Sequence, residues 1–322
     1  MKRLITSLAI CLATVTSVAA QNYPSKPITM YVPFAAGGPT DSVARLTAEA
    51  MSKSLGQQVL VENLPGAGGT IGSSRAAQAT PDGYTILLHH IGMSTAPTLY
   101  RKLDFDPTTA FAPIGLVTEA PMTIVARPDF KATTLAELIA TIKAEGEGIT
   151  YANAGVGAAS HLCGMLFMSA IDKQMTTVPY KGNGPIMTDL MGSQIDMTCD
   201  QATNTAGALK ANQIKGYAVT SPERQKAFPN LPTADEAGLP KFELSVWHGL
   251  YAPKGTPPDV VAKLTSALQV AVQDPALQQR LDAIATFPVT KDKATPQALQ
   301  ERLNSEIARW RPLIKAAGQF AD

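Results

Sequence analysis

Residues 31–45 read Tyr-Val-Pro-Phe-Ala-Ala-Gly-Gly-Pro-Thr-Asp-Ser-Val-Ala-Arg. A β-branched run at 28–32 precedes this stretch and stops at Pro33, and after the two glycines apolar residues recur at helical spacing. Thr40 stands where a residue that caps the helix start would be expected. The stretch therefore predicts a strand, a glycine turn and a helix.

Gly37 and Gly38 have no side chain, so a ligand can approach the main chain closely at these positions. Free N–H groups in the first turn of the following helix can bind an anion. Because the sequence has no Lys or Arg between Ile28 and Ala44, we expect such an anion to be held by main-chain amides and hydroxyls. The alternative is an ordinary strand–helix turn whose glycines serve packing only.

The N-terminal twenty residues read as a secretory signal peptide. Two basic residues precede an apolar run at 4–18 that is too short to span a bilayer, and small residues lead to a cleavage expected after Ala20. Cys11 lies in the apolar run and is expected to be discarded. Without the segment 1–20 the chain carries 25 Lys and Arg against 26 Asp and Glu, a net charge of −1. We therefore expect a periplasmic protein that binds no nucleic acid.

Strands and helices alternate along the first hundred residues, which is typical of a parallel sheet covered by helices. The opening pattern returns in the middle of the chain, where a strand, a small-residue loop and a helix follow one another. A second such unit implies a second lobe. Strands are expected at 28–32, 59–63, 84–89, 114–117, 122–126, 149–153, 176–179, 195–198, 214–219 and 242–251, and helices at 40–55, 70–79, 134–144, 161–171, 185–191, 259–272, 275–285 and 296–316.

The three C-terminal helices need a sheet to cover, and the N-terminal sheet is the nearest candidate. We therefore expect lobe 1 to combine residues 21–122 with 243–322, and lobe 2 to contain residues 123–242. Two chain crossings, near 120 and 243, would then act as a hinge. The predicted fold class is α/β with two lobes.

Several enzyme classes are excluded by spacing. The chain has no phosphate-loop lysine motif, no G-x-S-x-G elbow and no complete dinucleotide fingerprint. The four histidines lack the spacing of metal ligands, so we expect no metal, no cofactor and no enzymatic activity. Cys163 and Cys199 remain after export; a disulfide and two buried thiols both stay open.

Three loops are expected to meet at a cleft, namely 34–41, 90–94 and 154–161, because ligands in open α/β sheets lie beyond the carboxyl ends of the strands. The large apolar side chains of Phe34, Met93 and Trp247 could flank an aromatic ligand or pack between the lobes. Lys181 is interpreted as a solvated loop lysine. The candidate ligand-binding residues are Phe34, Ala36, Gly37, Gly38, Thr40, Asp41, His90, Gly92, Met93, Ser94, Ala154, Gly155, Gly157, Ser160, His161, Asp200, Gln201 and Trp247.

Six motifs together resemble the Bug family, the extracytoplasmic solute receptors of tripartite tricarboxylate transporters. They are Tyr23-Pro-Ser-Lys-Pro-Ile, Val32-Pro-Phe-Ala-Ala-Gly-Gly-Pro-Thr-Asp, Glu62-Asn-Leu-Pro-Gly-Ala-Gly-Gly, Pro81-Asp-Gly-Tyr-Thr, Pro179-Tyr-Lys-Gly and Tyr251-Ala-Pro-Lys-Gly-Thr-Pro. The resemblance covers essentially the whole mature chain. It implies a type II periplasmic-binding fold that closes on a small carboxylate.

The resemblance also implies that backbone and hydroxyl groups of the two glycine loops hold the ligand. The positions that match are Ala36, Gly37, Gly38, Thr40 and Asp41 in the first loop, and Ala154, Gly155, Gly157, Ser160 and His161 in the second. This chain departs from the pattern at Val156, where relatives often carry Ser or Thr, so a hydroxyl contact is expected to be lost there.

The resulting hypothesis is a monomeric periplasmic receptor for a small di- or tricarboxylate, an aromatic dicarboxylate such as terephthalate among them. It would deliver this ligand to the membrane subunits of a tripartite tricarboxylate transporter. Two alternatives stay open: a periplasmic hydrolase that uses Ser160 with His161, and a receptor that senses the same ligands.

Overall fold

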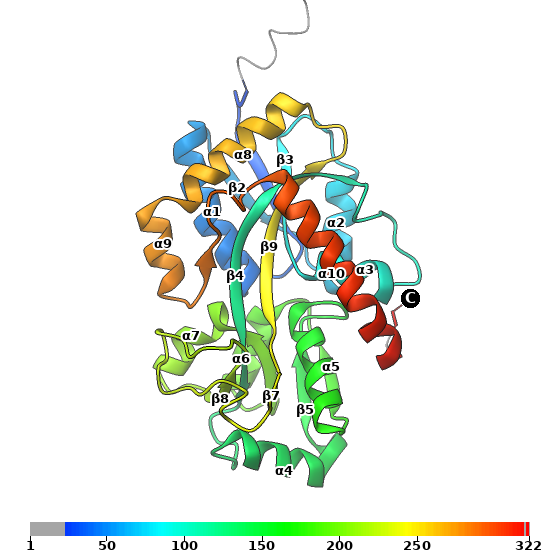
Figure 1. The fold of residues 1–322 in the computed structure, drawn as a ribbon, viewed down its shortest axis with the longest axis vertical. Coiled ribbons are helices and arrows are strands. Elements are labelled where there is room, and N and C mark those ends of the chain that lie inside the picture. The colour runs from blue at the N-terminus through cyan, green and yellow to red at the C-terminus, as the bar shows by residue number, and fades with distance from the viewer. Residues whose placement is uncertain (1–22, 319, 322) are drawn as a thin grey trace, which may run out of the picture.

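The computed structural model describes residues 23–318, 320 and 321. The predicted signal peptide, with Cys11, lies outside these residues. Figure 1 shows two lobes, one above the other, joined by two long strands that run through both. The ten strands form one mixed sheet in the order β2-β1-β3-β9-β4-β7-β5-β6, and β8 and β10 pair with β4.

Lobe 1, the upper lobe in Figure 1, begins with the predicted strand–turn–helix. β1 (Ile28–Val32) pairs in parallel with β2 (Val59–Asn63) and β3 (Thr85–His90). Helices from both ends of the chain pack together around this sheet: α1 on α8, and α3 on α10. The other elements of this lobe are α1 (Pro39–Leu55), η2 (Ala67–Gly69), α2 (Thr70–Ala77), α3 (Gly92–Leu99), α8 (Pro258–Val272), α9 (Pro275–Asp282), β10 (Phe287–Pro288) and α10 (Pro296–Ala317).

The two connecting strands are β4 (Phe111–Ala126) and β9 (Ser245–Pro253). β4 pairs with β9 as far as Pro121, and from Met122 onward it pairs with β7 and β8. The prediction of two separate strands, at 114–117 and 122–126, was wrong. The polar and proline residues between them interrupt the apolar pattern, but a single strand passes through and changes partners at that point.

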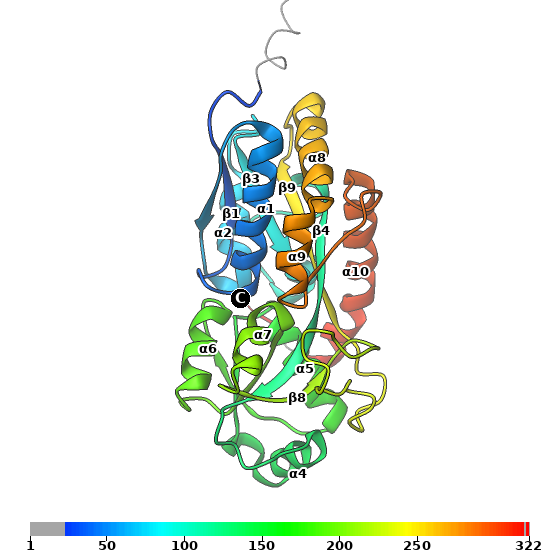
Figure 2. The same ribbon diagram turned by 90° about the vertical axis from the view of Figure 1, so that its left-hand side faces the viewer.

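Lobe 2 contains the second strand–loop–helix unit, and Figure 2 shows it below lobe 1. β5 lies between β6 and β7, parallel to both. Its elements are α4 (Leu135–Glu145), η3 (Gly146–Gly148), β5 (Thr150–Asn153), α5 (Ala159–Ile171), β6 (Thr176–Pro179), α6 (Asn183–Met191), β7 (Met197–Gln201), α7 (Ala202–Lys210) and β8 (Lys215–Val219).

Three further sequence predictions are corrected here. The segment 90–94 is not a loop, because His90 ends β3 and α3 begins at Gly92. β7 lies later than the predicted 195–198, so Asp200 and Gln201 belong to the strand instead of following it. Helices α3 and α7 were not predicted; α3 contains Gly92 and Pro97, which have low helix propensity, and it is held by packing against α10.

A disulfide joins Cys163 on α5 to Cys199 on β7, with 6.0 Å between the two Cα atoms. Both cysteines are buried, so the bond lies in the core of lobe 2. This settles the question that the sequence left open, in favour of the bridge. Among the described residues, no helix is both long and apolar enough to cross a bilayer.

Candidate ligand-binding cleft

The first glycine loop leads from β1 into α1. Gly37 has φ +78°, a left-handed conformation that side chains rarely adopt. Helix α1 starts at Pro39 with Gly38 at the N-cap, so the prediction of Thr40 as the cap was wrong. Proline suits the first helical position because it has no N–H to satisfy, and this moves the N-cap two residues earlier. Thr40 is buried, with its Oγ 3.5 Å from His248 Nε2.

Asp41 is buried and fully engaged with its own lobe. Its carboxylate accepts hydrogen bonds from Gly37 N–H, Arg45 Nε and Asn63 Nδ2 at 2.9–3.1 Å. Burial by itself raises the pKa of Asp41, but the hydrogen bonds and the Arg45 charge outweigh burial and hold the pKa below its usual value. These contacts fix the shape of the first glycine loop, so we assign Asp41 a positioning role.

The second glycine loop, Ala154–Ala158, leads from β5 into α5. Gly155 and Gly157 have φ of +103° and +85°. The two polar side chains that follow bind the loop itself: Ser160 Oγ accepts from Ala154 N–H, and His161 Nδ1 accepts from Gly157 N–H. Both side chains therefore hold the loop in place from the first turn of α5.

The first glycine loop contacts a segment of lobe 2 that the sequence analysis did not include in the site. Ala35 N–H donates to Lys181 O at 3.2 Å across the cleft. A Cβ added to Gly184 would lie 3.4 Å from Gly38 N, so the start of α6 faces the start of α1. The family motif at 179–182 was the signal that could have located this contact. The Lys181 side chain is exposed, as expected.

The second glycine loop contacts lobe 1 at a different place. A Cβ added to Gly155 would lie 3.0 Å from Gly68 N, and one added to Gly92 would lie 2.9 Å from Gly157 O. The two glycine loops therefore each approach a segment of the opposite lobe, and the lobes are in contact at both places in this structure.

Three buried histidines lie in lobe 1 beside the first glycine loop. The ring of Phe34 stacks on His90 at 4.4 Å and meets His89 edge-on at 5.5 Å, and the rings of His90 and His248 are 6.2 Å apart. Burial lowers the pKa of His89 to about 4 and of His248 to about 3, and burial together with the two neighbouring imidazoles lowers the pKa of His90 well below its usual value. The three imidazoles are therefore neutral at physiological pH.

His90 also supports the start of α3. Its Nδ1 accepts a hydrogen bond from Gly92 N–H at 2.9 Å, so the proton of the neutral ring is on Nε2. Ser94 Oγ donates to Ile91 O in the same turn, and Met93 is fully buried. Among the candidate residues between 90 and 94, His90 therefore has a side-chain donor, its Nε2–H, that the hydrogen bonds at the start of α3 do not use.

Asp200 is buried at the end of β7. Burial raises its pKa to about 7, although Asn204, Gln201 N–H and Asn183 donate hydrogen bonds to it. Asn183 begins α6, so Asp200 helps to place the helix start that faces the first glycine loop. Within the described residues, Gln201 Oε1 and Trp247 Nε1 are buried without a hydrogen-bond partner.

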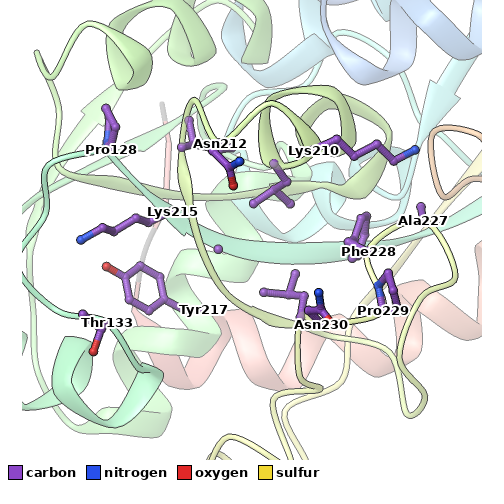
Figure 3. Close-up of a pocket in the computed structure, with 14 residues that line it drawn as sticks. Pro128, Thr133, Lys210, Asn212, Lys215, Tyr217, Ala227, Phe228, Pro229 and Asn230 are labelled. Carbon is purple, nitrogen blue, oxygen red and sulfur yellow. The ribbon is translucent and has the colours of Figure 1, made fainter.

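A cavity of about 670 Å³ lies elsewhere, on lobe 2 (Figure 3). Lys210, Lys215, Tyr217 and Phe228 are among its lining residues, and none of the candidate residues lines it. It is open and is shaped by β8 and the segment 227–231, away from the glycine loops. Both glycine loops lie instead where the two lobes meet. In the described part of the chain, no group of three or more His, Cys, Asp or Glu residues could hold a metal ion.

Solved structures of similar proteins define the class. The structure is similar to that of the periplasmic binding protein BugD, with a TM-score of 0.91 and 49% identity over 93% of this chain and 100% of that one. It is also similar to MatC from Rhodopseudomonas palustris with bound malate, with a TM-score of 0.88 and 37% identity over 91% and 100% of the two chains. The chain has the fold of a periplasmic solute-binding protein, and the predicted α/β fold class is confirmed.

A further R. palustris protein, solved with adipate, has a TM-score of 0.87 and 32% identity over 92% of this chain and 98% of its own. The family model of the tripartite tricarboxylate transporter family receptor matches residues 43–319. This chain belongs to that receptor family, which includes the Bug proteins, so the resemblance seen in the motifs is confirmed.

Proposed function

We propose that this protein is a periplasmic receptor that binds a small dicarboxylate between its lobes and delivers it to the membrane subunits of a tripartite tricarboxylate transporter. Membership of the receptor family supports binding and transport. The relatives solved with malate and adipate both hold dicarboxylates, which supports this ligand class. The predicted signal peptide supports export, and we expect a monomer.

The main support from the structure is the way two helix starts face each other across the cleft. Helix α1 begins at Pro39 in lobe 1, helix α6 begins at Asn183 in lobe 2, and Gly38 and Gly184 are in near contact between them. Each helix start carries a partial positive charge and unpaired N–H groups, so two such ends repel each other at this distance. A carboxylate bound beside them would offset this repulsion and stabilise closure.

A second carboxylate could bind at the start of α5. Its first turn, with Ala159 and Ser160, follows the second glycine loop and belongs to lobe 2. A ligand that spans both positions would contact both lobes and so favour the closed arrangement over an open one. We propose that β4 and β9 form the hinge for this motion, with residues 21–122 and 243–322 moving against 123–242.

The candidate residues then divide into two roles. We propose that the main-chain amides of Ala36, Gly38 and Val156, with the Thr40 hydroxyl, contact the ligand, because the N–H groups of Gly37, Gly155 and Gly157 already donate to Asp41, Asn153 and His161. Asp41, Ser160 and His161 would position those loops. The unpaired polar groups of Gln201 and Trp247 are further candidates for ligand contacts.

The hydrolase hypothesis receives less support. Ser160 Oγ accepts from Ala154 N–H and His161 Nδ1 accepts from Gly157 N–H, so each side chain already has a role within the loop. A nucleophile needs a base within hydrogen-bond reach, and neither contact provides that arrangement. Sensing would use the same site with a different partner.

Calorimetry on matched ligand pairs tests the proposal. Adipate is compared with hexanoate, and terephthalate with benzoate, so that each pair differs by one carboxylate. A charge-assisted hydrogen bond contributes about 1.5–3 kcal/mol, so the dicarboxylate should bind at least about tenfold more tightly within a pair. Equal affinities within every pair would contradict recognition of two carboxylates, and turnover of a bound ligand would contradict a receptor role.

A further inference from the structure

The main-chain carbonyl of Val156, in the second glycine loop, is enclosed by lobe 1. Tyr100 Oη donates a hydrogen bond to it at 2.7 Å. A Cβ added to Gly68 would lie only 1.8 Å from the same oxygen, so the carbonyl occupies space that any side chain at that position would fill. Position 156 is where the side-chain hydroxyl of relatives was expected to be missing, and its backbone makes a cross-cleft contact.

Tyr100 is held firmly on its own side of the cleft. It caps the C-terminal end of α3, with its N–H donating to Ala96 O. The C-terminal segment pairs with the residues on either side: Arg101 N–H donates to Ala321 O, and Ala321 N–H donates to Leu99 O. Burial raises the pKa of Tyr100 to about 12, so the hydroxyl keeps its proton and remains a donor at physiological pH.

We propose that Tyr100 is a latch that holds the closed cleft without touching the ligand. This inference rests on the proposed receptor function, because it concerns the closed state of that same site. Tyr100 belongs to lobe 1 and Val156 to lobe 2, so the hydrogen bond exists only when the lobes are together. Opening separates the two groups and exposes both to water. The latch therefore slows opening, and with it ligand release.

A small, defined effect follows from this geometry. A typical hydrogen bond contributes a net free energy that corresponds to a factor of about three to ten in an equilibrium constant. Tyr100→Phe should therefore raise the ligand dissociation rate about three- to tenfold. Because the ligand enters the open form, which lacks this contact, loss of the hydroxyl should not lower the association rate.

Tyr217→Phe is the matched control. It also removes a tyrosine hydroxyl that donates to a main-chain carbonyl, that of Ala132 at 2.9 Å, but this bond lies wholly within lobe 2. Tyr217→Phe therefore removes a comparable hydrogen bond, but one that does not cross the cleft. Gly68→Ala perturbs the latch from the other side, because its methyl group would displace the Val156 carbonyl.

The experiment has a kinetic arm and a ligand-free arm. Stopped-flow measurements with malate and adipate give the dissociation rates of the wild type and the three variants. Nitroxide labels on I71C and M191C, which are exposed positions on α2 and α6, report the distance between the lobes by pulsed electron paramagnetic resonance without ligand. Tyr100→Phe and Gly68→Ala should release ligand faster and shift the distances to longer values, and Tyr217→Phe should do neither.

The latch is overturned if Tyr100→Phe gives the same interlobe distances as Tyr217→Phe and, where a ligand binds, the same dissociation rate. If the wild type binds neither malate nor adipate but the distances still lengthen in Tyr100→Phe, the latch is supported and the proposed ligand class fails. Circular dichroism of each variant confirms that the comparison is made on folded protein.

Discussion

Mild acid should destabilise this protein through its three buried histidines. His89, His90 and His248 are neutral when folded because burial lowers the pKa of each, whereas in the unfolded chain each titrates near 6.5. Between pH 6 and pH 5 the unfolded chain therefore binds up to three more protons at these positions than the folded protein. Stability that is present above pH 6.5 is lost as the pH falls.

Asp200 acts in the opposite direction over the same interval. Burial raises its folded pKa to about 7, so the folded protein already holds a proton on it that the unfolded chain, with a pKa near 3.8, does not bind. From pH 6 to pH 5 the three histidines together lower the free energy of unfolding by roughly 3 to 4 kcal/mol, and Asp200 raises it by roughly 1 kcal/mol. The net loss in the free energy of unfolding is about 2 kcal/mol per pH unit.

Urea unfolding at pH 6.0 and 5.0, followed by tryptophan fluorescence under non-reducing conditions, measures this loss. Asp200→Asn removes the compensating proton, so the loss of stability between the two pH values should grow to roughly 3 to 4 kcal/mol in this variant. His248→Gln removes one titrating imidazole and should reduce the loss to about 1 kcal/mol. A wild-type stability that is unchanged or higher at pH 5.0 would refute the reasoning.

Three further predictions concern the cleft and the core. Gly38→Val should abolish dicarboxylate binding in a folded protein, because its methyl groups would enter the narrow space between the first glycine loop and the start of α6; near-normal affinity by calorimetry would contradict this. Thr40→Ala should weaken binding by roughly 1–2 kcal/mol, and Lys181→Ala by less, because the anion is expected to be held by amides and hydroxyls; calorimetry that gives the reverse order would point to a cation in the site. Replacing both Cys163 and Cys199 by alanine should lower the free energy of unfolding by about 4 kcal/mol, the value expected for a cross-link between residues 36 positions apart; unchanged urea unfolding would contradict that estimate.

The sequence alone determined the features that depend on residues close together in the chain. The strand–glycine–helix unit at 28–55 folds as predicted except for its N-cap, which is Gly38 and not Thr40, and α8 and α10 begin and end within one residue of their predicted bounds. Periodicity, proline and glycine act over one or two turns, so these elements could be identified without tertiary information. The six motifs together also identified the receptor family, which the family model confirms.

The tertiary structure decided which of these pieces face each other. Gly38 meets Gly184, and Tyr100 meets Val156, across 146 and 56 positions of sequence. No local pattern encodes such pairs, because they form only when the lobes close. The same holds for the partner change within β4 at Pro121, where the local pattern predicted a break.

Chemical state was also decided by the fold. The sequence indicated His90 as a candidate ligand-binding residue, but the neutrality of His90 and His248 follows from burial beside Phe34 and α1. Asp200 and Asp41 are both buried aspartates, yet one pKa is raised and the other lowered. Each carboxylate accepts three hydrogen bonds, but Asp200 is more deeply buried and its donors are neutral, whereas one donor to Asp41 is the charged Arg45. The sequence states which side chain is present at a position. Its exposure to solvent and its hydrogen-bond partners, which set its pKa, are decided only when distant segments pack together.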